Sequence, residues 1–360
     1  MVIMVAIDMH AKSLVCELGC GRDEPRRGTY SNNGVGHQRL IDDVTAMKQD
    51  LGSGAEVVVA YEASGLGYVL YDRIREAGYR CAVLAPTEML RSKSGYKKKT
   101  DRKDCSYIYE AIRAHILAGN RLPEIWVPNE QLREDREMVR ARFDAGQKVT
   151  RVKVQIHTLL KKFGIQKHED LNNWTKAFHR WLVEVAGSKG AGFRIGMETL
   201  LRQLAFLETE QKQLDRAILA LSKEERYRDQ CAEQQKVPGV GLITAMTFLT
   251  EIGDVMRFEN RKQVGSYLGL VPSTFESGKA DDRKGRITRD GPYRIRSVLN
   301  QALWAHLRCN GQEKAAYDRI AEKNPKRKKK AVVAGMRRLG IRLWHIAKDV
   351  ESSKKLRLAA

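Results

Sequence analysis

The sequence lacks the patterns that mark membrane-spanning and zinc-binding proteins. No stretch approaches the roughly 18 consecutive apolar residues of a membrane-spanning helix. The apolar start from Met1 to Ile7 is broken by Asp8, so no signal peptide is expected. The cysteines form no Cys-x-x-Cys pair and no grouping with histidine; they are Cys16, Cys20, Cys81, Cys105, Cys231 and Cys309. We therefore expect reduced thiols, no zinc site and a cytoplasmic location.

Acidic residues are scarce relative to basic ones. The 360 residues include 65 Lys and Arg but only 44 Asp and Glu, so the formal net charge is +21. Such a charge destabilises the folded chain by self-repulsion, and this cost is offset when the phosphates of a polyanion are neutralised. Nucleic acid is therefore the expected partner, and a membrane surface is disfavoured. A chain of this length is expected to divide into two or three domains.

Strand and helix patterns alternate near the start of the chain. Val2 to Asp8 is apolar and β-branched, and Ser13 to Leu18 alternates in polarity, which predicts two antiparallel strands joined by a tight turn. Ala55 to Ala60 and Cys81 to Ala85 are also predicted strands, and Leu66 to Ala77 between them has helical spacing. This alternation predicts an α/β sheet covered by helices, with ligands gathering beyond the strand ends.

Four acids stand at positions from which they can converge. Asp8 and Glu62 each follow a predicted strand, and a helix would put Asp101 and Asp104 on one face. Seven basic residues lie between Arg91 and Lys103, around the second pair. Four carboxylates brought together repel one another, so the cluster favours bound cations, and two Mg²⁺ ions there could act on a phosphodiester. The alternative for Asp101 and Asp104 is a solvated helix of mixed charge.

Three of these motifs resemble those of a known family. Val-Ala-Ile-Asp8, Tyr61 to Gly65 and Lys99 to Asp104 resemble the DEDD motif of the Piv-type transposases and DNA invertases, the insertion-sequence-110 family. The resemblance extends to about Asn310. It implies a ribonuclease-H-like, RuvC-like N-terminal domain, and it implies that the four acids are catalytic metal ligands.

A serine followed by glycine lies in a second motif, Gly269 to Gly291. Ser277 precedes Gly278 in a loop that is followed by several Lys and Arg residues. Neutral serine is a weak nucleophile and no His-Asp relay is evident nearby, so the residues alone favour a turn. The resemblance instead implies that Ser277 is the recombinase serine. Lys279 departs from the small or acidic residue that is more usual after this Ser-Gly pair.

Two heptad seams run through the middle of the chain. One lies in a predicted long helix, Pro128 to Phe163, and a leucine seam runs from Leu200 to Leu221. Arg142 and Gln211 interrupt them at core positions. We expect these helices to associate between chains or to form an arm that grips nucleic acid; the alternative is an antiparallel hairpin within one chain. The basic residues of such an arm are Arg140, Lys148, Arg151, Lys153, Lys161 and Lys162.

Phosphate contacts are predicted at two kinds of position. Gly239 and Gly241 precede an apolar helix, Leu242 to Ile252, and resemble a helix-hairpin-helix element whose backbone N–H groups bind phosphate. A plain turn is the alternative. The other candidates are basic residues near the acids and the serine: Lys97, Lys98, Lys99, Arg102, Lys103, Lys279, Arg283, Lys284, Arg286 and Arg289.

These patterns predict an α/β plus α protein with four regions. Residues 1–125 are expected to form the RuvC-like domain, and residues 126–230 a helical coiled-coil region. Residues 231–325 are expected to form a mainly helical C-terminal transposase domain with the hairpin element and the serine. Residues 326–360 are expected to form a basic helical tail without a catalytic role.

The resemblance implies a bacterial, nucleoid-associated transposase or DNA recombinase. Such an enzyme cuts and rejoins donor and target DNA through a 5′-phosphoserine intermediate, with Mg²⁺ on its acids, a noncoding bridge RNA as guide, and dimers that pair into tetramers. The absence of a base-reading motif such as a zinc finger agrees with specificity supplied by RNA. Two alternatives stay open: a RuvC-like metal-dependent junction nuclease that uses water, and a nucleic-acid-binding protein without catalysis.

Overall fold

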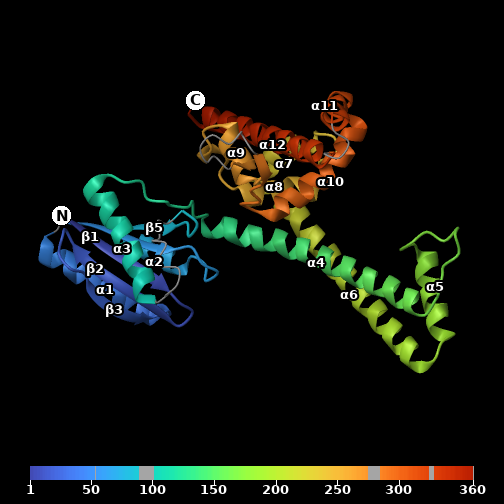
Figure 1. Cartoon of the computed structure of the whole chain (residues 1–360), viewed down its shortest axis with the longest axis horizontal. Coiled ribbons are helices and arrows are strands. Elements are labelled where there is room, and N and C mark those ends of the chain that lie inside the picture. The colour runs from blue at the N-terminus through green and yellow to red at the C-terminus, as the bar shows by residue number, and fades with distance from the viewer. Residues whose placement is uncertain (53, 89–100, 275–283, 324–327, 360) are drawn as a thin grey trace. The chain divides into compact units, whose positions relative to one another are not determined.

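The computed structural model describes residues 1–52, 54–88, 101–274, 284–323 and 328–359, with only the backbone described at 101–103, 274, 284, 358 and 359. It divides the chain into two compact units, Met1–Pro128 and Asn129–Ala360 (Figure 1). The first unit contains a five-stranded sheet and the second is mainly helical. Within the described residues, no helix combines the length and the apolar character needed to cross a membrane.

The first unit is built on a sheet with the strand order β3-β2-β1-β4-β5. β1 (Val2–Met9) pairs antiparallel with β2 (Ser13–Cys20), which pairs antiparallel with β3 (Arg26–Ser31). β4 (Glu56–Glu62) runs parallel to β1, and β5 (Arg80–Leu84) runs parallel to β4. The predicted α/β sheet is therefore confirmed, with β3 as a strand that the sequence patterns do not indicate.

Helices cover both faces of this sheet because its central strands are apolar on both sides. α1 (Gly34–Leu51) and α2 (Val69–Glu76) share one core cluster with Ile7, and α3 (Asp101–Ala118) shares another with Ala6. Successive residues of a strand point to opposite faces. Every second residue of β1 from position 4 onward therefore faces α3.

In the second unit, α4 (Glu130–Lys162) and α6 (Ala191–Leu221) form a long antiparallel pair, joined at one end through α5 (Lys176–Gly187) (Figure 1). Their seams meet within the chain, which corresponds to the hairpin alternative. Association between chains is therefore not needed to bury them. The buried residues of this arm include Val149, Val152, Ile156, Leu160, Phe178, Leu182, Met197 and Leu204.

Polar contacts also join the two arm helices. Arg142, which interrupts the first seam, donates through Nε to Asp215 Oδ1 at 2.7 Å. Lys153 Nζ lies 2.9 Å from Glu208 Oε1 and 4.9 Å from the ring centre of Trp174. Lys153, one of the cations predicted to grip nucleic acid, is therefore engaged in holding the hairpin together.

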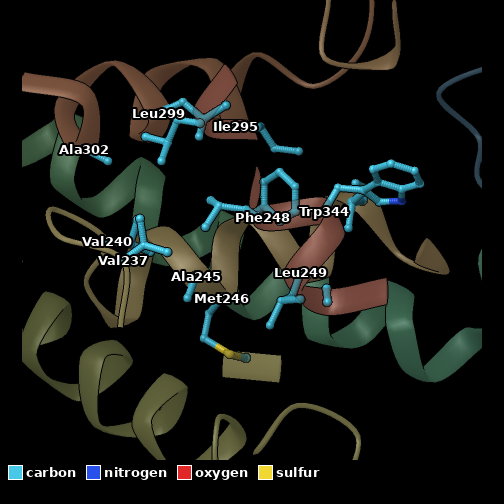
Figure 2. Close-up of a cluster of buried hydrophobic side chains, with 14 of the residues drawn as sticks. Val237, Val240, Ala245, Met246, Phe248, Leu249, Ile295, Leu299, Ala302 and Trp344 are labelled. Atoms are coloured by element: carbon cyan, nitrogen blue, oxygen red, sulfur yellow. The ribbon is translucent and has the colours of Figure 1, made fainter. Parts of the chain in front are cut away.

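The remaining elements form a helical body around α8 (Leu242–Ile252), which is buried from Ala245 onward. Figure 2 shows how side chains of α8 meet Ile295, Leu299 and Trp344 in the core of this body. The other elements are α7 (Arg228–Gln235), η2 (Val255–Arg257), α9 (Arg261–Tyr267), β6 (Pro272–Thr274), β7 (Lys284–Ile287), α10 (Tyr293–Cys309), α11 (Gly311–Glu322) and α12 (Lys328–Ala359).

The first turns of α4 attach the arm to this body. Arg140 donates through Nε and Nη2 to the two carboxylate oxygens of Glu251, at 2.8 and 2.9 Å, and Glu251 is buried. Arg136 donates to the carbonyl oxygens of Thr250 and Glu251 at the end of α8. A bidentate ion pair with a buried carboxylate is a strong contact. Arg140 is therefore a structural residue in this unit, not a free cation of the arm.

Residues 326–360, predicted as a basic tail, include the core helix α12. Trp344 is buried, and its Nε1 donates to the carbonyl oxygen of Val255 at 2.9 Å. Leu339 and Leu343 lie in the same apolar cluster as α8. The apolar face of α12 is therefore buried in the body.

Candidate functional site

Asp8 is the penultimate residue of β1 and Glu62 is the last residue of β4, two neighbouring parallel strands of the first unit. Ile7 pairs with Tyr61 in the β1–β4 register, so Asp8 and Glu62 follow at the next matching position. Ala6 and Ala60 belong to the cluster under α3, so strand alternation puts both acids on the α3 face. Both side chains are half-buried.

The first turns of α3 pack against the end of β1. Cys105 is fully buried, and its Sγ donates to the carbonyl oxygens of Ala6 and Val15 at 3.4 and 3.3 Å. Burial raises the pKa of the Cys105 thiol to about 12, so the thiol keeps its proton and remains a donor. Asp104 is adjacent in sequence and half-buried, and Asp101 begins α3 one turn earlier. The chain therefore brings the start of α3 to the strand that carries Asp8.

A buried carboxylate attaches α3 to β2. Glu17 is 3% exposed, and its Oε1 accepts from Ser106 Oγ at 2.8 Å and from Arg27 Nε at 3.0 Å. Ser106 lies two residues after Asp104 on α3. The sequence gives little sign of this contact, because Glu17 reads as the polar position of an alternating strand. It fixes the end of the helix at which the two predicted acids lie.

His10, between β1 and β2, is a neighbour of Asp8 that the sequence patterns do not mark as a site residue. Its Nε2 lies 3.2 Å from Asp8 Oδ2. The turn is held by Asn32, which donates to the carbonyl oxygen of His10 at 2.6 Å and pairs with His37 Nε2 at 2.8 Å. Burial and the nearby Arg73 lower the pKa of His37, so this ring stays neutral near pH 7. The signal available in the sequence is the spacing of two between Asp8 and His10.

The donor set at the strand ends suits a hard divalent cation, because carboxylate oxygens are the ligands that Mg²⁺ prefers. Among the side chains that the structure describes, no three His, Cys, Asp or Glu residues lie close enough together to hold a metal ion. Asp8, Glu62 and Asp104 thus share one region of the sheet without forming a complete metal group. The side chain of Asp101 lies outside the description.

The predicted serine belongs to the segment between β6 and β7. Ser277, Lys279 and Arg283 lie outside the described residues, as do Lys97, Lys98 and Lys99; at Arg102, Lys103 and Lys284 the description covers the backbone alone. The flanking strands pair antiparallel. Ser273 Oγ donates to the carbonyl oxygen of Arg286 at 3.0 Å. Arg286 and Arg289 are both exposed, which leaves their charge accessible.

Gly239 has a packing role in the turn between α7 and α8. Its φ is 86°, and a Cβ there would lie 2.6 Å from the carbonyl oxygen of Ala302 in α10. The buried His306 also pairs through Nδ1 with the carbonyl oxygen of Pro238 at 2.7 Å. Gly241 precedes α8 and has open space where a Cβ would be added. Close approach to α10 thus explains Gly239 without a ligand, and phosphate binding by the two glycines stays a prediction.

The chain matches two protein-family models. Residues 5–165 match a transposase model of the DEDD type, and residues 232–318 match the model of the transposase IS116/IS110/IS902 family. The first match begins within β1 and covers the rest of the sheet, α3 and all of α4, and a DEDD transposase domain implies a ribonuclease-H-like fold. The second begins within α7, covers the elements from α8 to α10 with the β6–β7 hairpin, and extends into α11.

Curated relatives agree with these matches. The "Putative transposase y4qE" of Sinorhizobium fredii is 30% identical over 305 residues, which is 84% of this chain and 71% of the relative. The transposase for insertion sequence element IS1111A of Coxiella burnetii is 24% identical over 307 residues, 83% of this chain and 78% of the relative. The pilin gene-inverting protein of Moraxella bovis is 31% identical over 105 residues, 29% of this chain and 32% of the relative. With both models in order along the chain and relatives aligned over most of its length, the chain belongs to the IS110 family of transposases.

Proposed function

We propose that this transposase cuts and rejoins DNA through a 5′-phosphoserine on Ser277, with Asp8, Glu62, Asp101 and Asp104 as the acids of the same site. The observation that carries the proposal is the position of Asp8 and Glu62, one residue beyond the Ile7–Tyr61 pair of the adjacent strands β1 and β4, on the face against which α3 packs. Ligands of α/β sheets bind beyond the carboxyl ends of the strands. In this proposal the acids and the serine act at the same DNA phosphate. They come either from one chain or from two chains.

The proposed reaction consists of two transesterifications. The Ser277 oxygen attacks the phosphorus, the P–O bond to the 3′-oxygen breaks, and the proton lost by the serine balances the proton gained by the released 3′-hydroxyl. A hydroxyl of the partner strand then attacks the phosphoserine, a new phosphodiester forms, and the serine recovers its proton. One phosphoester bond is exchanged for another at each step, so joining needs no ATP.

The acids would hold Mg²⁺, with two ions as the expected number. When bound, Mg²⁺ would polarise the phosphodiester and neutralise the charge that develops on its oxygens. The role of the chain is to hold the carboxylates together in spite of their mutual repulsion. Cys105 and Glu17 contribute to this by fixing the start of α3 against β1 and β2.

Nucleic-acid binding is proposed for the basic residues near Asp101 and Asp104 and for those near Ser277. The net charge of +21 supports this assignment, as does the exposure of Arg286 in β7 and of Arg289 just after it. The same role is proposed for Lys97, Lys98, Lys99, Arg102, Lys103, Lys279, Arg283 and Lys284, and for the backbone at Gly239 and Gly241. A noncoding bridge RNA and a dimer that pairs into a tetramer are proposed from the family resemblance.

Trapping of a covalent protein–DNA adduct tests the proposal. The wild-type chain is incubated with substrate DNA and Mg²⁺, denatured, and analysed for DNA that remains attached to protein. Ser277→Ala should abolish the adduct. Ser273→Ala is the matched control, because this hydroxyl lies in β6 of the same hairpin and donates to a backbone carbonyl. DNA cleavage without an adduct, retained in Ser277→Ala, would instead identify a nuclease that uses water.

Sequencing of the nucleic acid that copurifies with the protein tests whether a bridge RNA guides it. A single RNA species of defined length, sequenced from purified protein, is expected for an RNA-guided transposase. RNA of mixed length and sequence would contradict that part of the proposal and would leave the serine chemistry to its own test.

A further inference from the structure

Arg296, at the start of α10, joins the two ends of the serine hairpin. Its Nη1 donates to the carbonyl oxygens of Leu268, Asp290 and Gly291, at 3.2, 2.9 and 3.2 Å. Leu268 precedes β6, and Asp290 and Gly291 follow β7, so one guanidinium nitrogen spans both ends. Among the described contacts, the guanidinium of Arg296 forms hydrogen bonds with these backbone oxygens, and the Asp290 carboxylate acts on it only through its charge.

The backbone is packed too closely at this point to admit side chains. Gly269 has a φ of 63°, and a Cβ there would lie 2.1 Å from the carbonyl oxygen of Asp290 and 2.7 Å from Arg296 Nη1. Gly291 has a φ of 75°, and its Cβ would lie 1.9 Å from the carbonyl oxygen of Tyr267. We call this contact between residues 267–269 and 289–291 the hairpin base.

The pairing of β6 with β7 contributes little to the stability of the hairpin. β6 has three residues and β7 has four, and a two-stranded ribbon of that length is not stable by itself in water. Their register shifts between Pro272 and Thr274, which interrupts the ladder further. One backbone bond, from the Thr288 N–H to the carbonyl oxygen of Val271 at 3.0 Å, links the ladder to the hairpin base.

The environment of Arg296 agrees with a structural use of its charge. Burial, and then the like charge of Arg289, lowers its pKa from the ordinary value of arginine. Arg289 itself has a φ of 59°, a left-handed conformation that is uncommon for a residue with a side chain. Three carbonyl dipoles directed at one nitrogen offset the cost of placing this cation there.

We infer that Arg296 is a positioning residue, which sets the geometry of the β6–β7 hairpin and thereby the place from which Ser277 acts. This inference rests on the proposed role of Ser277. Arginine suits the task because its planar guanidinium has several fixed donors, whereas the lysine ammonium is a point charge on a flexible stem. A change at Arg296 should therefore slow the attack of the serine without removing a contact to DNA.

Arg296→Lys is the test, with Arg294→Lys as its matched control. Arg294 lies in the same first turns of α10, but it donates to Asp144 of α4 at 3.1 Å and stacks on Tyr293. Misplacement of a reacting group by about 1 Å costs on the order of 100-fold in rate. We expect Arg296→Lys to slow adduct formation by about 10- to 100-fold with unchanged DNA affinity, and Arg294→Lys to retain the wild-type rate.

Hydrogen exchange supplies a readout that does not depend on activity. In Arg296→Lys, peptides over 270–273 and 287–291 should exchange faster, while α8 should keep its protection. Arg296→Gln, which keeps an amide donor, is a second variant with the same expected pattern. A normal adduct rate in a folded Arg296→Lys protein, or faster exchange spread evenly over the body, overturns the inference. Loss of the proposed function is recognised separately, by an adduct that persists in Ser277→Ala.

Discussion

Asp8 and Glu62 in the first unit and the β6–β7 hairpin in the second are positioned by different kinds of contact. The two acids end parallel strands whose neighbours are buried between layers of helices. The hairpin depends on a guanidinium and on two glycines that let backbone meet backbone. An apolar layer tolerates substitution if its volume is kept. A close contact between two backbones does not tolerate an added side chain. The geometry of the β6–β7 hairpin should therefore be more sensitive to small changes in side-chain volume than the apolar layers around the strands that carry the acids.

The largest effect is expected from Asp8→Asn, which removes a charge from the proposed metal site and keeps the shape of the side chain. Loss of several kcal/mol of charge stabilisation in the transition state corresponds to a rate lower by about 10³-fold or more. Adduct formation should fall by that factor while salt-dependent DNA binding is kept. Asp50→Asn, at an exposed acid near the end of α1, is the control. A normal rate of adduct formation in Asp8→Asn would show that the first unit takes no part in the reaction.

The next effect is expected from Gly291→Ala in the hairpin base. A Cβ 1.9 Å from the carbonyl oxygen of Tyr267, at a φ of 75°, forces the backbone to move. We expect the free energy of unfolding of the second unit to fall by about 1 to 3 kcal/mol, together with the rate of adduct formation. Urea unfolding followed by tryptophan fluorescence measures this, because Trp174, Trp181, Trp304 and Trp344 lie in that unit.

Gly311→Ala is the matched control for that change. Gly311 begins α11, has no positive φ, and has open space where a Cβ would be added. Alanine should be neutral or slightly stabilising there. An equal loss of unfolding free energy in both glycine variants would show that the close backbone approach at the hairpin base does not make the hairpin unusually sensitive. The proposed difference between the hairpin and the strand ends would then be wrong.

A smaller effect is expected from Glu17→Ala, which removes the polar link between β2 and α3. The hydroxyl of Ser106 and the guanidinium of Arg27 lose their acceptor, which should lower the free energy of unfolding of the first unit by about 1 to 2 kcal/mol. Hydrogen exchange over the first turns of α3 measures this change. Glu24→Ala, at an exposed position after β2, should leave exchange unaltered. No difference between the variants would mean that apolar packing alone holds α3.

The sequence predicts the sheet and the place of two acids well, for a physical reason. A buried parallel strand is a continuous apolar run, and an acid that closes the run marks where the strand ends, as Asp8 does in β1 and Glu62 in β4. β3 escapes this reasoning because its residues, Arg26–Ser31, are mainly polar or exposed and pair at the edge of the sheet. The seams of α4 and α6 predict that each needs a partner, but periodicity does not say whether the partner lies in the same chain.

The contacts that fix the hairpin could not be predicted in this way. Arg296 reads as one of many basic residues, and its role depends on carbonyl oxygens from Leu268 and Asp290, which are far from each other in the sequence. The pairing of Arg140 with Glu251 is similar, because a cation assigned to a nucleic-acid arm has a buried partner 111 positions away. Side chains that bind distant backbone or buried carboxylates leave no periodic signal.

The smallest effect is expected from Cys105→Ser in α3, which packs on one face of the sheet, compared with Cys16→Ser in β2, whose side chain lies on the other face. Both thiols are fully buried, but Cys105 lies against the carbonyl oxygens of Ala6 and Val15, which a serine hydroxyl can use. The described residues give the Cys16 thiol no acceptor, so a hydroxyl there should cost about 1 to 3 kcal/mol, against less than about 1 kcal/mol at Cys105. Urea unfolding followed by exchange of the β1 amides measures both. If Cys105→Ser lowers the free energy of unfolding more than Cys16→Ser does, the hydrogen bonds to these two carbonyl oxygens do not stabilise α3. Apolar packing alone would then hold the start of α3 near Asp8.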